Sequence, residues 1–455
     1  MCFVLKFILI GDIMKLSLNN IIKATNAVLV KGEESEKEYS FSTDTRTIEA
    51  TQIYLPLKGE TFDGEKFIEN ALEKNIDGYF TSDKNLIFDK AKFVLYVPDT
   101  KIAYLQLANF YKKQINPYTI AITGSSGKTT VKEMMYSVFK NAGKTVKSIL
   151  NHNNEIGLCQ TLSNLKNDTQ YLIAEMGMRG LGEIELLSKY AEPDIAVIVN
   201  SGSAHIGRLG SLLNIAKAKF EVAKYLKNEG ILIAHNNPLI KEVNDNEHKT
   251  IYFGLESNEL QIKEMTESTC LFNYKGYDYF LNVAGEHNVQ NALSVIEAGL
   301  FAKLSEEIIA KGLKEFSPIE KRWEIEEVKG FKVINDSYNS NPESVKAALN
   351  TFLSYTQGNK SVVLGDMGEL GLNEEEYHKN IGIFLDNYSC DYVLTFGDLA
   401  KYITPTKNKY IHFEDKKELS DFIIKNLPAN SSILLKASRF MKFEEIIEEL
   451  KNNGV

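Results

Sequence analysis

Short apolar runs alternate with helix-patterned stretches in the middle third of the chain. The apolar runs occupy residues 118–123, 171–176, 194–200 and 231–235. Runs of this length suit strands that are buried on both faces of a mostly parallel sheet. A helix rich in Ala and Leu, predicted over 288–301, would close this central domain, whose expected bounds are 99–316.

The segments on either side predict two further domains, so the predicted fold class is α/β in three domains. Residues 14–98 predict a small N-terminal α/β substrate domain around one helix pattern, 67–75. Its strand-like runs are 40–45, 52–57, 78–81 and 92–97. Residues 317–455 are similar to a doubly wound, Rossmann-like domain, although no GxGxxG is present. Its strands are expected at 361–365, 392–396 and 433–435.

An apolar run at the start of the chain is interpreted as an upstream extension. Lys6 interrupts this run, and no small-residue cleavage site follows before Asp12. The run is also far shorter than the roughly 20 residues of a membrane span. We therefore expect no membrane span and take Met14 as the native start, with residues 1–13 as the extension.

The overall charge limits the partners that we expect. The chain has 455 residues, of which 44% are hydrophobic and 25% charged, as in soluble globular proteins, and its formal net charge is −9. An acidic chain is a poor general binder of nucleic acid or anionic membrane, so we expect neither partner. The four cysteines are scattered without a CxxC pair, which favours a reducing, cytoplasmic location and no zinc site.

The strongest local signal is a glycine-rich loop between a predicted strand and a predicted helix. In this context the backbone N–H groups surround phosphate oxygens, Lys128 brings positive charge to the β- and γ-phosphates, and Thr129 offers an oxygen to Mg²⁺. The residues expected to bind ATP here are Gly124, Ser125, Ser126, Gly127, Lys128, Thr129 and Thr130.

The loop departs from the usual GxxxxGK[ST] pattern, which would place glycine where Ile122 stands. This departure weakens the interpretation as an ordinary GTPase or kinase. A simple Gly/Ser turn with an incidental lysine is the alternative, and the placement between strand and helix argues against it.

Polar side chains follow other predicted strands, where ligands of α/β proteins collect. Glu175 closes one strand, and Asn200 ends the next, with His205 shortly after it. Taken singly, a strand-end glutamate is as often solvated as it is a metal ligand. A lone histidine is more often structural, and a helix lysine such as Lys219 is usually solvated.

Taken together, these sites resemble the Mur ligase family in family order, from about residue 43 to residue 439. The matching segments include Thr123-Gly124-Ser125-Ser126-Gly127-Lys128-Thr129-Thr130, Asn151-His152-Asn153-Asn154-Glu155-Ile156-Gly157, Glu175-Met176-Gly177, Gly285-Glu286-His287-Asn288 and Asp336-Ser337-Tyr338-Asn339-Ser340-Asn341-Pro342. The resemblance implies transfer of the γ-phosphoryl group of ATP to a carboxylate, followed by attack of an amine on the acyl phosphate. Segments 336–342 and 365–371 are most similar to the member that takes UDP-muramoyl-tripeptide and D-Ala-D-Ala.

The resemblance also implies metal ligands. Two Mg²⁺ ions would offset the charges of the phosphates and the carboxylate. Thr129 matches the residue on the first ion, and Glu175 and His205 match ligands near the second. Lys219 matches a lysine that several members carry as a carbamate, an anion that can lie beside Mg²⁺. Lys217 is a near neighbour, and the choice between the two lysines rests on their spacing from His205.

Other residues are matched to the nucleotide. Asn288 and Asn291 match adenine-side residues and share one helix face, although a helix N-cap is the alternative for Asn288. Arg322 and Asp336 match C-terminal residues that reach the phosphates and the ribose, so domain closure would complete the site and exclude water. The catalytic set implied by the resemblance is Lys128, Glu175, His205, Lys219 and Arg322.

The loop around Arg46 resembles the one that holds the uridine nucleotide, where an arginine can pair with a phosphate; an ordinary surface arginine is the alternative. Lys321 and Ala437 stand where glycine is usual in the family, and Cys159 or Gln160 stands where proline is usual. These departures bear on loop conformation rather than on the reaction. The residues assigned to substrates are Thr45, Arg46, Asn153, Asn154, Lys436, Ser438 and Arg439.

Three alternatives remain beside a monomeric ligase of this kind. A folylpolyglutamate synthase relative would begin directly with the ATP domain and would lack the loop 43–46. A P-loop switch or motor ATPase would place a Walker-B aspartate in the region of Glu175 and His205. A non-catalytic nucleotide-binding module would not need so many polar groups at strand ends.

Overall fold

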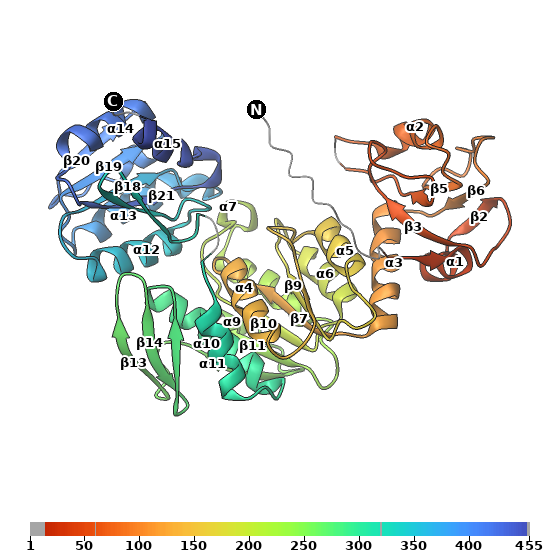
Figure 1. Ribbon diagram of the computed structural model, residues 1–455, viewed down its shortest axis with the longest axis horizontal. Helices are drawn as coiled ribbons and strands as arrows, with labels where there is room; N and C mark the ends of the chain where they lie inside the picture. The colour runs from red at the N-terminus through yellow and green to blue at the C-terminus, as the bar shows by residue number, and fades with distance from the viewer. Residues whose placement is uncertain (1–13, 60, 319–320, 453–455) are drawn as a thin grey trace. The chain divides into compact units, whose positions relative to one another are not determined.

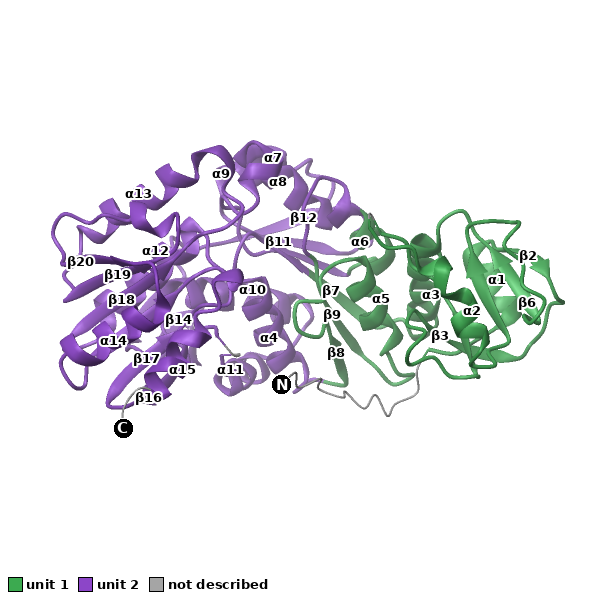
Figure 2. Ribbon diagram, turned by 90° about the horizontal axis from the view of Figure 1, so that it is seen from above, with its two compact units in different colours: residues 1–121, 143–176, 186–193 green, residues 122–142, 177–185, 194–455 purple. Residues whose placement is uncertain are grey.

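The computed structural model describes residues 14–59, 61–318 and 321–452 (Figure 1). Residues 1–13, interpreted above as an upstream extension, lie outside this range. The chain forms two compact units (Figure 2). Of the described residues, unit 1 comprises 14–59, 61–121, 143–176 and 186–193, and unit 2 comprises 122–142, 177–185, 194–318 and 321–452. The domain bounds expected near residues 98 and 316 stay predictions.

Unit 1 begins with a six-stranded sheet in the order β1-β3-β4-β5-β6-β2. Strands β3 to β6 run parallel, and the edge strands β1 and β2 pair antiparallel. The core between this sheet and its helices includes Tyr54, Ile68 and Val94. The elements are β1 (Leu16–Ser17), α1 (Leu18–Thr25), β2 (Val28–Lys31), β3 (Glu38–Ser42), β4 (Gln52–Tyr54), α2 (Ile68–Leu72), β5 (Gly78–Thr81) and β6 (Phe93–Tyr96).

The helix predicted over 67–75 is shorter than expected. Phe67 belongs to a 3₁₀ turn, Gly64–Phe67, and α2 ends at Leu72 because residues 73–75 form a turn. The following helix, α3 (Thr100–Ile115), begins where Asp99 accepts the N–H groups of Lys101 and Ile102. In the same unit, α3 packs against α5 (Glu155–Ser163), and β8 (Thr145–Lys147) pairs parallel with β9 (Tyr171–Glu175). Strand β7 (Tyr118–Thr123) passes from unit 1 into unit 2.

Unit 2 contains the end of β7, helix α4 (Lys128–Phe139) and three parallel strands, β10 (Ile195–Ile198), β11 (Ile231–His235) and β12 (Lys249–Phe253). Every residue of β10 is buried, as the continuous apolar run predicts. Helices α10 (Glu286–Phe301) and α11 (Glu306–Glu315) pack on α4. The remaining helices of this part are α6 (Glu183–Ala191), which the unit boundary divides, α7 (Ile206–Leu209), α8 (Leu212–Phe220) and α9 (Pro238–Val243).

An antiparallel sheet that the sequence patterns did not predict lies between β12 and α10. It contains β13 (Leu260–Met265), β14 (Cys270–Tyr274) and β15 (Tyr277–Leu281). The alternating burial of β14 shows that only one face is covered, which explains why no continuous apolar run marks it.

The C-terminal sheet has the order β16-β17-β21-β18-β19-β20. Only the hairpin β16–β17 is antiparallel; the other pairs are parallel. Val363, Leu394 and Ile433 lie in its core. The elements are β16 (Glu324–Val328), β17 (Phe331–Asn335), α12 (Pro342–Tyr355), β18 (Lys360–Gly365), α13 (Glu374–Leu385), β19 (Tyr392–Phe396), β20 (Tyr410–Phe413), α14 (Lys416–Asn426), β21 (Ser432–Lys436) and α15 (Glu444–Asn452).

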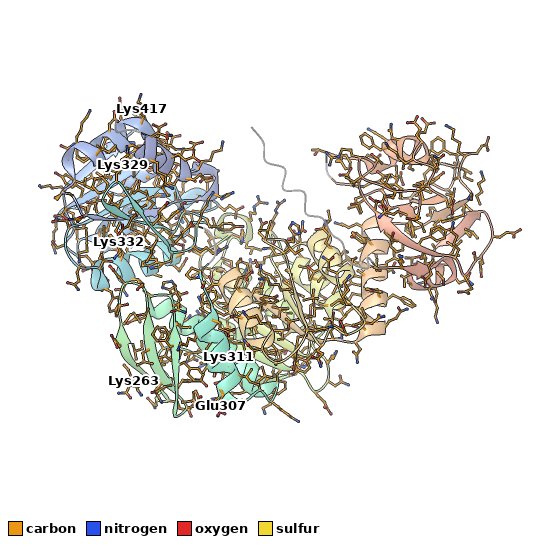
Figure 3. The ribbon with its side chains drawn as sticks, in the orientation of Figure 1. Lys263, Glu307, Lys311, Lys329, Lys332 and Lys417 are labelled. Atoms are coloured by element: carbon orange, nitrogen blue, oxygen red, sulfur yellow. The ribbon has the colours of Figure 1, made fainter. Side chains whose placement is uncertain are left out.

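Two contacts connect the start of this sheet to the loop between β13 and β14. Lys332, labelled in Figure 3, forms an ion pair with Glu267. The indole N–H of Trp323 donates to the Glu267 carbonyl at 3.2 Å. Trp323 is the only tryptophan of the chain and is buried, so its fluorescence can report on this junction. In the described part of the chain, no helix has the length and apolar character needed to cross a membrane.

Candidate functional site

The glycine-rich loop has the strand–loop–helix form that the sequence predicts. Gly127 is the N-cap of α4 and has a φ of 76°, which favours glycine. A Cβ atom on Gly127 would lie 2.8 Å from Oδ1 of Asn291, and one on Gly124 would lie 3.0 Å from Cβ of Val199. The close approach of α10 to Gly127, and of Val199, which follows β10, to Gly124 therefore leaves no room for a side chain at either position.

Asn200, which was not among the predicted site residues, holds this loop. Its Oδ1 accepts the backbone N–H groups of Ser125 and Ser126 at 3.0 and 2.9 Å. Its Nδ2 donates to the Ser126 carbonyl and to Ser126 Oγ at 3.1 and 3.0 Å. A polar residue directly after a strand of a parallel sheet was the only sequence signal for this role.

The first turn of α4 carries the predicted phosphate and metal groups. Lys128 is half-buried, and its Nζ donates to the Gly124 carbonyl at 2.6 Å. Thr129 is buried, and its hydroxyl oxygen accepts a hydrogen bond from Nη2 of Arg322 at 3.1 Å. The structure thus brings Lys128, Thr129 and Arg322 together at the loop, although Arg322 lies 193 residues after Thr129.

Lys219 is fully buried in α8, whereas Lys217 is exposed. The Lys219 Nζ has no hydrogen-bond partner within the described residues. Burial lowers the pKa of Lys219 well below its usual value, the charge of Lys128 lowers it further, and Glu221 opposes the shift. Burial therefore favours the neutral amine, which is the form that can act as a nucleophile.

Glu175 ends β9 in unit 1 and is buried. Its backbone N–H donates to Ser148 Oγ, and its Oε1 accepts Nδ2 of Asn153 at 3.1 Å. The neighbouring Asn154 caps α5 by accepting the Gly157 N–H at 2.9 Å. Of the two asparagines matched to substrate, one orients Glu175 and the other caps a helix.

His205 contacts the C-terminal part of unit 2. Its backbone is left-handed, with a φ of 66°, and Nδ1 lies 2.5 Å from Oε2 of Glu369. This contact lowers the pKa of the Glu369 carboxyl. The backbones of Gly207 and Gly371 approach so closely that a Cβ on Gly371 would lie 2.6 Å from the Gly207 Cα.

The first turns of α10 place Asn288 and Asn291 on one buried face. Asn288 is not the N-cap, because Gly285 occupies that position, so the alternative interpretation of Asn288 was wrong. Instead, Asn288 Nδ2 donates to the Ala284 carbonyl at 2.7 Å, and Asn291 Nδ2 donates to Asn288 Oδ1 at 3.3 Å.

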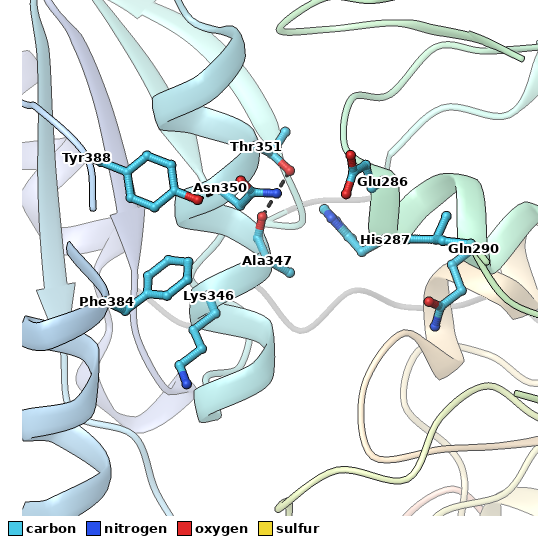
Figure 4. A pocket seen from close by; sticks show the side chains of 10 residues that line it. Glu286, His287, Gln290, Lys346, Ala347, Asn350, Thr351, Phe384 and Tyr388 are labelled. Carbon is cyan, nitrogen blue, oxygen red and sulfur yellow. Dashed lines mark hydrogen bonds between the residues drawn. The ribbon is translucent and has the colours of Figure 1, made fainter. Parts of the chain in front are cut away.

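A pocket of about 400 Å³ opens beside these turns. Figure 4 shows α10 side chains on one side and those of α12 and α13 on the other. Burial lowers the pKa of His287 to about 4, so its imidazole is neutral at pH 7. The pocket is lined by Leu255, Glu286, His287, Gln290, Lys346, Ala347, Asn350, Thr351, Phe384 and Tyr388.

The C-terminal loops place two arginines near one aromatic ring. The guanidinium carbons of Arg322 and Arg439 lie 4.1 and 5.7 Å from the centroid of the Tyr338 ring. Lys321, which replaces a usual glycine, has a φ of 60°. A left-handed backbone at this position explains why glycine suits it.

Lys436 and Ser438 hold loops of the C-terminal part. Lys436 Nζ lies 3.0 Å from Oδ2 of Asp336 and also donates to the carbonyls of Asp336 and Asn339. Ser438 Oγ accepts the Gly368 N–H at 3.0 Å. Both residues therefore support the loops that carry Asp336 and the segment 365–371.

Arg46 lies in the N-terminal sheet region and is strongly exposed. It forms a two-pronged pair with Asp44, with Nη2 and Oδ2 2.6 Å apart. Hydrogen bonds from Arg46 lower the pKa of the Asp44 carboxyl. Thr45 lies between these two residues and is half-buried.

The expected metal ligands offer a chemically suitable donor set. Thr129 brings a hydroxyl, Glu175 a carboxylate and His205 an imidazole, and hydroxyl and carboxylate oxygens suit Mg²⁺. The described residues contain no cluster of three or more His, Cys, Asp or Glu side chains that would hold an ion without further ligands. The unpartnered Nζ of buried Lys219 fits conversion to a carbamate, which would add an anionic ligand.

Comparisons with known proteins agree along the chain. Residues 39–119 match the family model "Mur ligase family, catalytic domain", residues 122–299 match "Mur ligase middle domain", and residues 321–439 match "Mur ligase, glutamate ligase domain". A UDP-N-acetylmuramoyl-tripeptide–D-alanyl-D-alanine ligase of Bacillus subtilis is 37% identical over 93% of this chain and 97% of its own length.

Two solved structures are also similar. MurF from Acinetobacter baumannii has a TM-score of 0.90 and 30% identity, covering 97% of this chain and 100% of its own. MurF ligase from Thermotoga maritima, in complex with ADP, has a TM-score of 0.83 and 26% identity, covering 91% of this chain and 97% of its own.

Proposed function

The chain belongs to the Mur ligase family, and we propose that it is the ATP-dependent ligase that joins D-alanyl-D-alanine to UDP-N-acetylmuramoyl-tripeptide. The observation that carries this proposal is the 37% identity to the B. subtilis ligase of that name, over 93% of this chain. The product would be a peptidoglycan precursor. The three-domain α/β fold is that of the similar MurF structures.

The reaction proceeds through an acyl phosphate. The terminal carboxylate of the tripeptide attacks the γ-phosphorus of ATP, and ADP leaves. The amine of D-alanyl-D-alanine then attacks the acyl carbon, the amide bond forms, and phosphate and one proton leave. Lys128 and the backbone N–H groups of the loop offset the negative charge of the phosphates. The guanidinium of Arg322 places a second positive charge beside Thr129.

Mg²⁺ fits the donor set described above. We propose that Thr129, Glu175 and His205 contribute ligands to two ions, with Lys219 as a carbamate. When bound, the ions would reduce the repulsion between the phosphates and the attacking carboxylate. The residues of this chain place those donors: Arg322 fixes the Thr129 hydroxyl, and Asn153 orients the Glu175 carboxylate.

We propose the carbamate because Lys219 is buried and its pKa is lowered. Its neutral amine would add to CO₂, forming an N–C bond and releasing one proton. Burial of Lys219 and exposure of Lys217 support the choice of Lys219 between the two lysines.

The binding sites for the organic substrates are proposals from the same resemblance. The pocket beside Asn288 and Asn291 has room for a nucleotide base, and Asp336 would reach the ribose. Arg46, with Thr45, would bind the uridine diphosphate, and Arg439 would reach the peptide. We further propose a monomer that acts in the cytoplasm, where ATP is available.

Release of phosphate from ATP, measured with each substrate alone and with both, tests this function. Release only with both substrates, matched by an amide product, is the expected result. Release that is indifferent to either substrate would contradict the ligase and favour a P-loop ATPase.

A further inference from the structure

Glu343, in the first turn of α12, binds the loop that follows β10. Its Oε1 accepts the Ser203 backbone N–H at 3.0 Å, and its Oε2 accepts the Ser203 hydroxyl at 2.9 Å. The helix start does not need this carboxylate as a cap. Asn341 and Ser344 already form a reciprocal capping box there. The carboxylate is therefore available to contact a segment 140 residues earlier in the chain.

Gly202 permits this contact by its lack of a side chain. A Cβ on Gly202 would lie 2.9 Å from Cδ of Glu343, closer than such atoms approach. Gly202 does not have a positive φ, so alanine would suit its backbone. Alanine at this position would therefore act mainly by displacing the Glu343 carboxylate.

The same loop is bonded directly to the phosphate loop. Gly202 N–H donates to Ser125 Oγ at 3.0 Å, and Ser125 Oγ–H donates to the Gly202 carbonyl at 3.2 Å. Asn200, two residues earlier, accepts the N–H groups of Ser125 and Ser126. Continuous hydrogen bonding thus joins α12 to the loop that we assign to ATP.

We propose that Glu343 is a positioning residue for ATP. Through Ser203 and Gly202, Glu343 fixes the phosphate loop when α12 lies against the segment that follows β10. This inference rests on the proposed function for the identity of the nucleotide. Arg322 reaches the same loop through Thr129, so the C-terminal part of unit 2 contacts the loop at two separate points. Loss of the Glu343 contact weakens nucleotide binding without removing any group that touches the phosphates.

Glu343→Ala and Glu343→Gln test the proposal in the full chain. Because a charged hydrogen-bond acceptor is lost, we expect KM for ATP to rise roughly tenfold in the alanine variant, which corresponds to about 1.4 kcal/mol. We expect KM for the UDP-tripeptide to change less than about twofold. Gln retains one acceptor oxygen and should lie between wild type and alanine.

Glu418→Ala is the matched control. Glu418 is also an exposed first-turn glutamate, on α14, so its removal reproduces the loss of helix-dipole stabilisation without the loop contact. A second readout is the affinity for ADP, measured by Trp323 fluorescence or by calorimetry. It should fall roughly tenfold in Glu343→Ala and remain unchanged in Glu418→Ala.

Gly202→Ala provides an independent variant. It should weaken ADP binding as Glu343→Ala does. The variant that carries both substitutions should bind ADP no more weakly than either single variant. Wild-type ADP affinity in all variants, or a loss that tracks a lower Tm, would overturn the role of Glu343. If the wild type binds ADP but lacks ligase activity, the proposed function fails while the ADP comparison still decides this inference.

Discussion

The guanidinium of Arg322 stacks over the ring of Tyr338, with its carbon 4.1 Å from the ring centroid, while its Nη2 donates to Thr129. Arg439 approaches the same ring at 5.7 Å. The aromatic face therefore orients an arginine that reaches the phosphate loop.

Replacing Tyr338 by Leu should lower kcat/KM for ATP. A cation–π contact of this kind contributes about 1 kcal/mol, so we expect a loss of roughly fivefold. Tyr338→Phe keeps the ring and should retain nearly full activity. Steady-state kinetics with varied ATP measures the difference, and equal losses in both variants would show that the hydroxyl, not the ring, matters.

Lys128→Ala should reduce turnover by about 100-fold or more, because a positioned cation is lost beside the phosphates. Lys140→Ala, at the other end of α4, is the control, since Lys140 forms a partly exposed pair with Glu315. Activity is measured as phosphate release with both substrates. Retained activity in Lys128→Ala would refute the assignment of the loop to ATP.

Lys219→Ala should lose activity that a small carboxylate, such as formate or acetate, partly restores. The added anion would occupy the space of the proposed carbamate. Lys217→Ala, two residues away and exposed, should remain active. A fully active Lys219→Ala enzyme would contradict the carbamate.

The thermal stability of the chain should depend on pH through Lys219, in buffer freed of CO₂. Burial lowers the pKa of Lys219 in the folded chain well below the usual 10.5, so between these two pKa values the unfolded chain binds a proton that the folded chain has lost. Stability of the wild type therefore rises as the pH increases toward 10.5. Lys219→Met, which lacks this dependence, should have a higher Tm than wild type at pH 7.

That difference in Tm should shrink at pH 10, and Lys217→Met should show no comparable trend. Thermal unfolding followed by circular dichroism at the two pH values measures it. A difference that does not vary with pH would mean that Lys219 stays charged in the folded chain.

Arg46→Ala should raise KM for the uridine substrate several-fold more than KM for ATP, since a two-pronged arginine–phosphate pair would be lost. Lys23→Ala, an exposed cation on α1 of the same sheet domain, is the control. An equal effect on both substrates, or a larger effect on ATP, would place the uridine site elsewhere.

Much of the fold could be predicted because its signals are local. The runs at 118–123, 231–235 and 392–396 coincide with β7, β11 and β19, since strands buried on both faces need continuous apolar residues. Strands β13 to β15 were missed because half of their side chains face away from the core. The helix over 67–75 was predicted too long because its last three residues form a turn, in which Asn75 has a left-handed backbone, and its first residue belongs to a 3₁₀ turn.

The sequence by itself determined the phosphate loop, because the strand, the glycines and Lys128 follow one another within a few residues. Only the tertiary structure decided which distant groups hold that loop. Asn200 is marked only as a polar residue at the end of a predicted strand, and Glu343 carries no local signal. Their roles depend on chain segments 74 to 140 residues apart meeting at hydrogen-bond distance. Burial likewise distinguished Lys219 from Lys217, since neighbouring residues of one helix can face opposite environments.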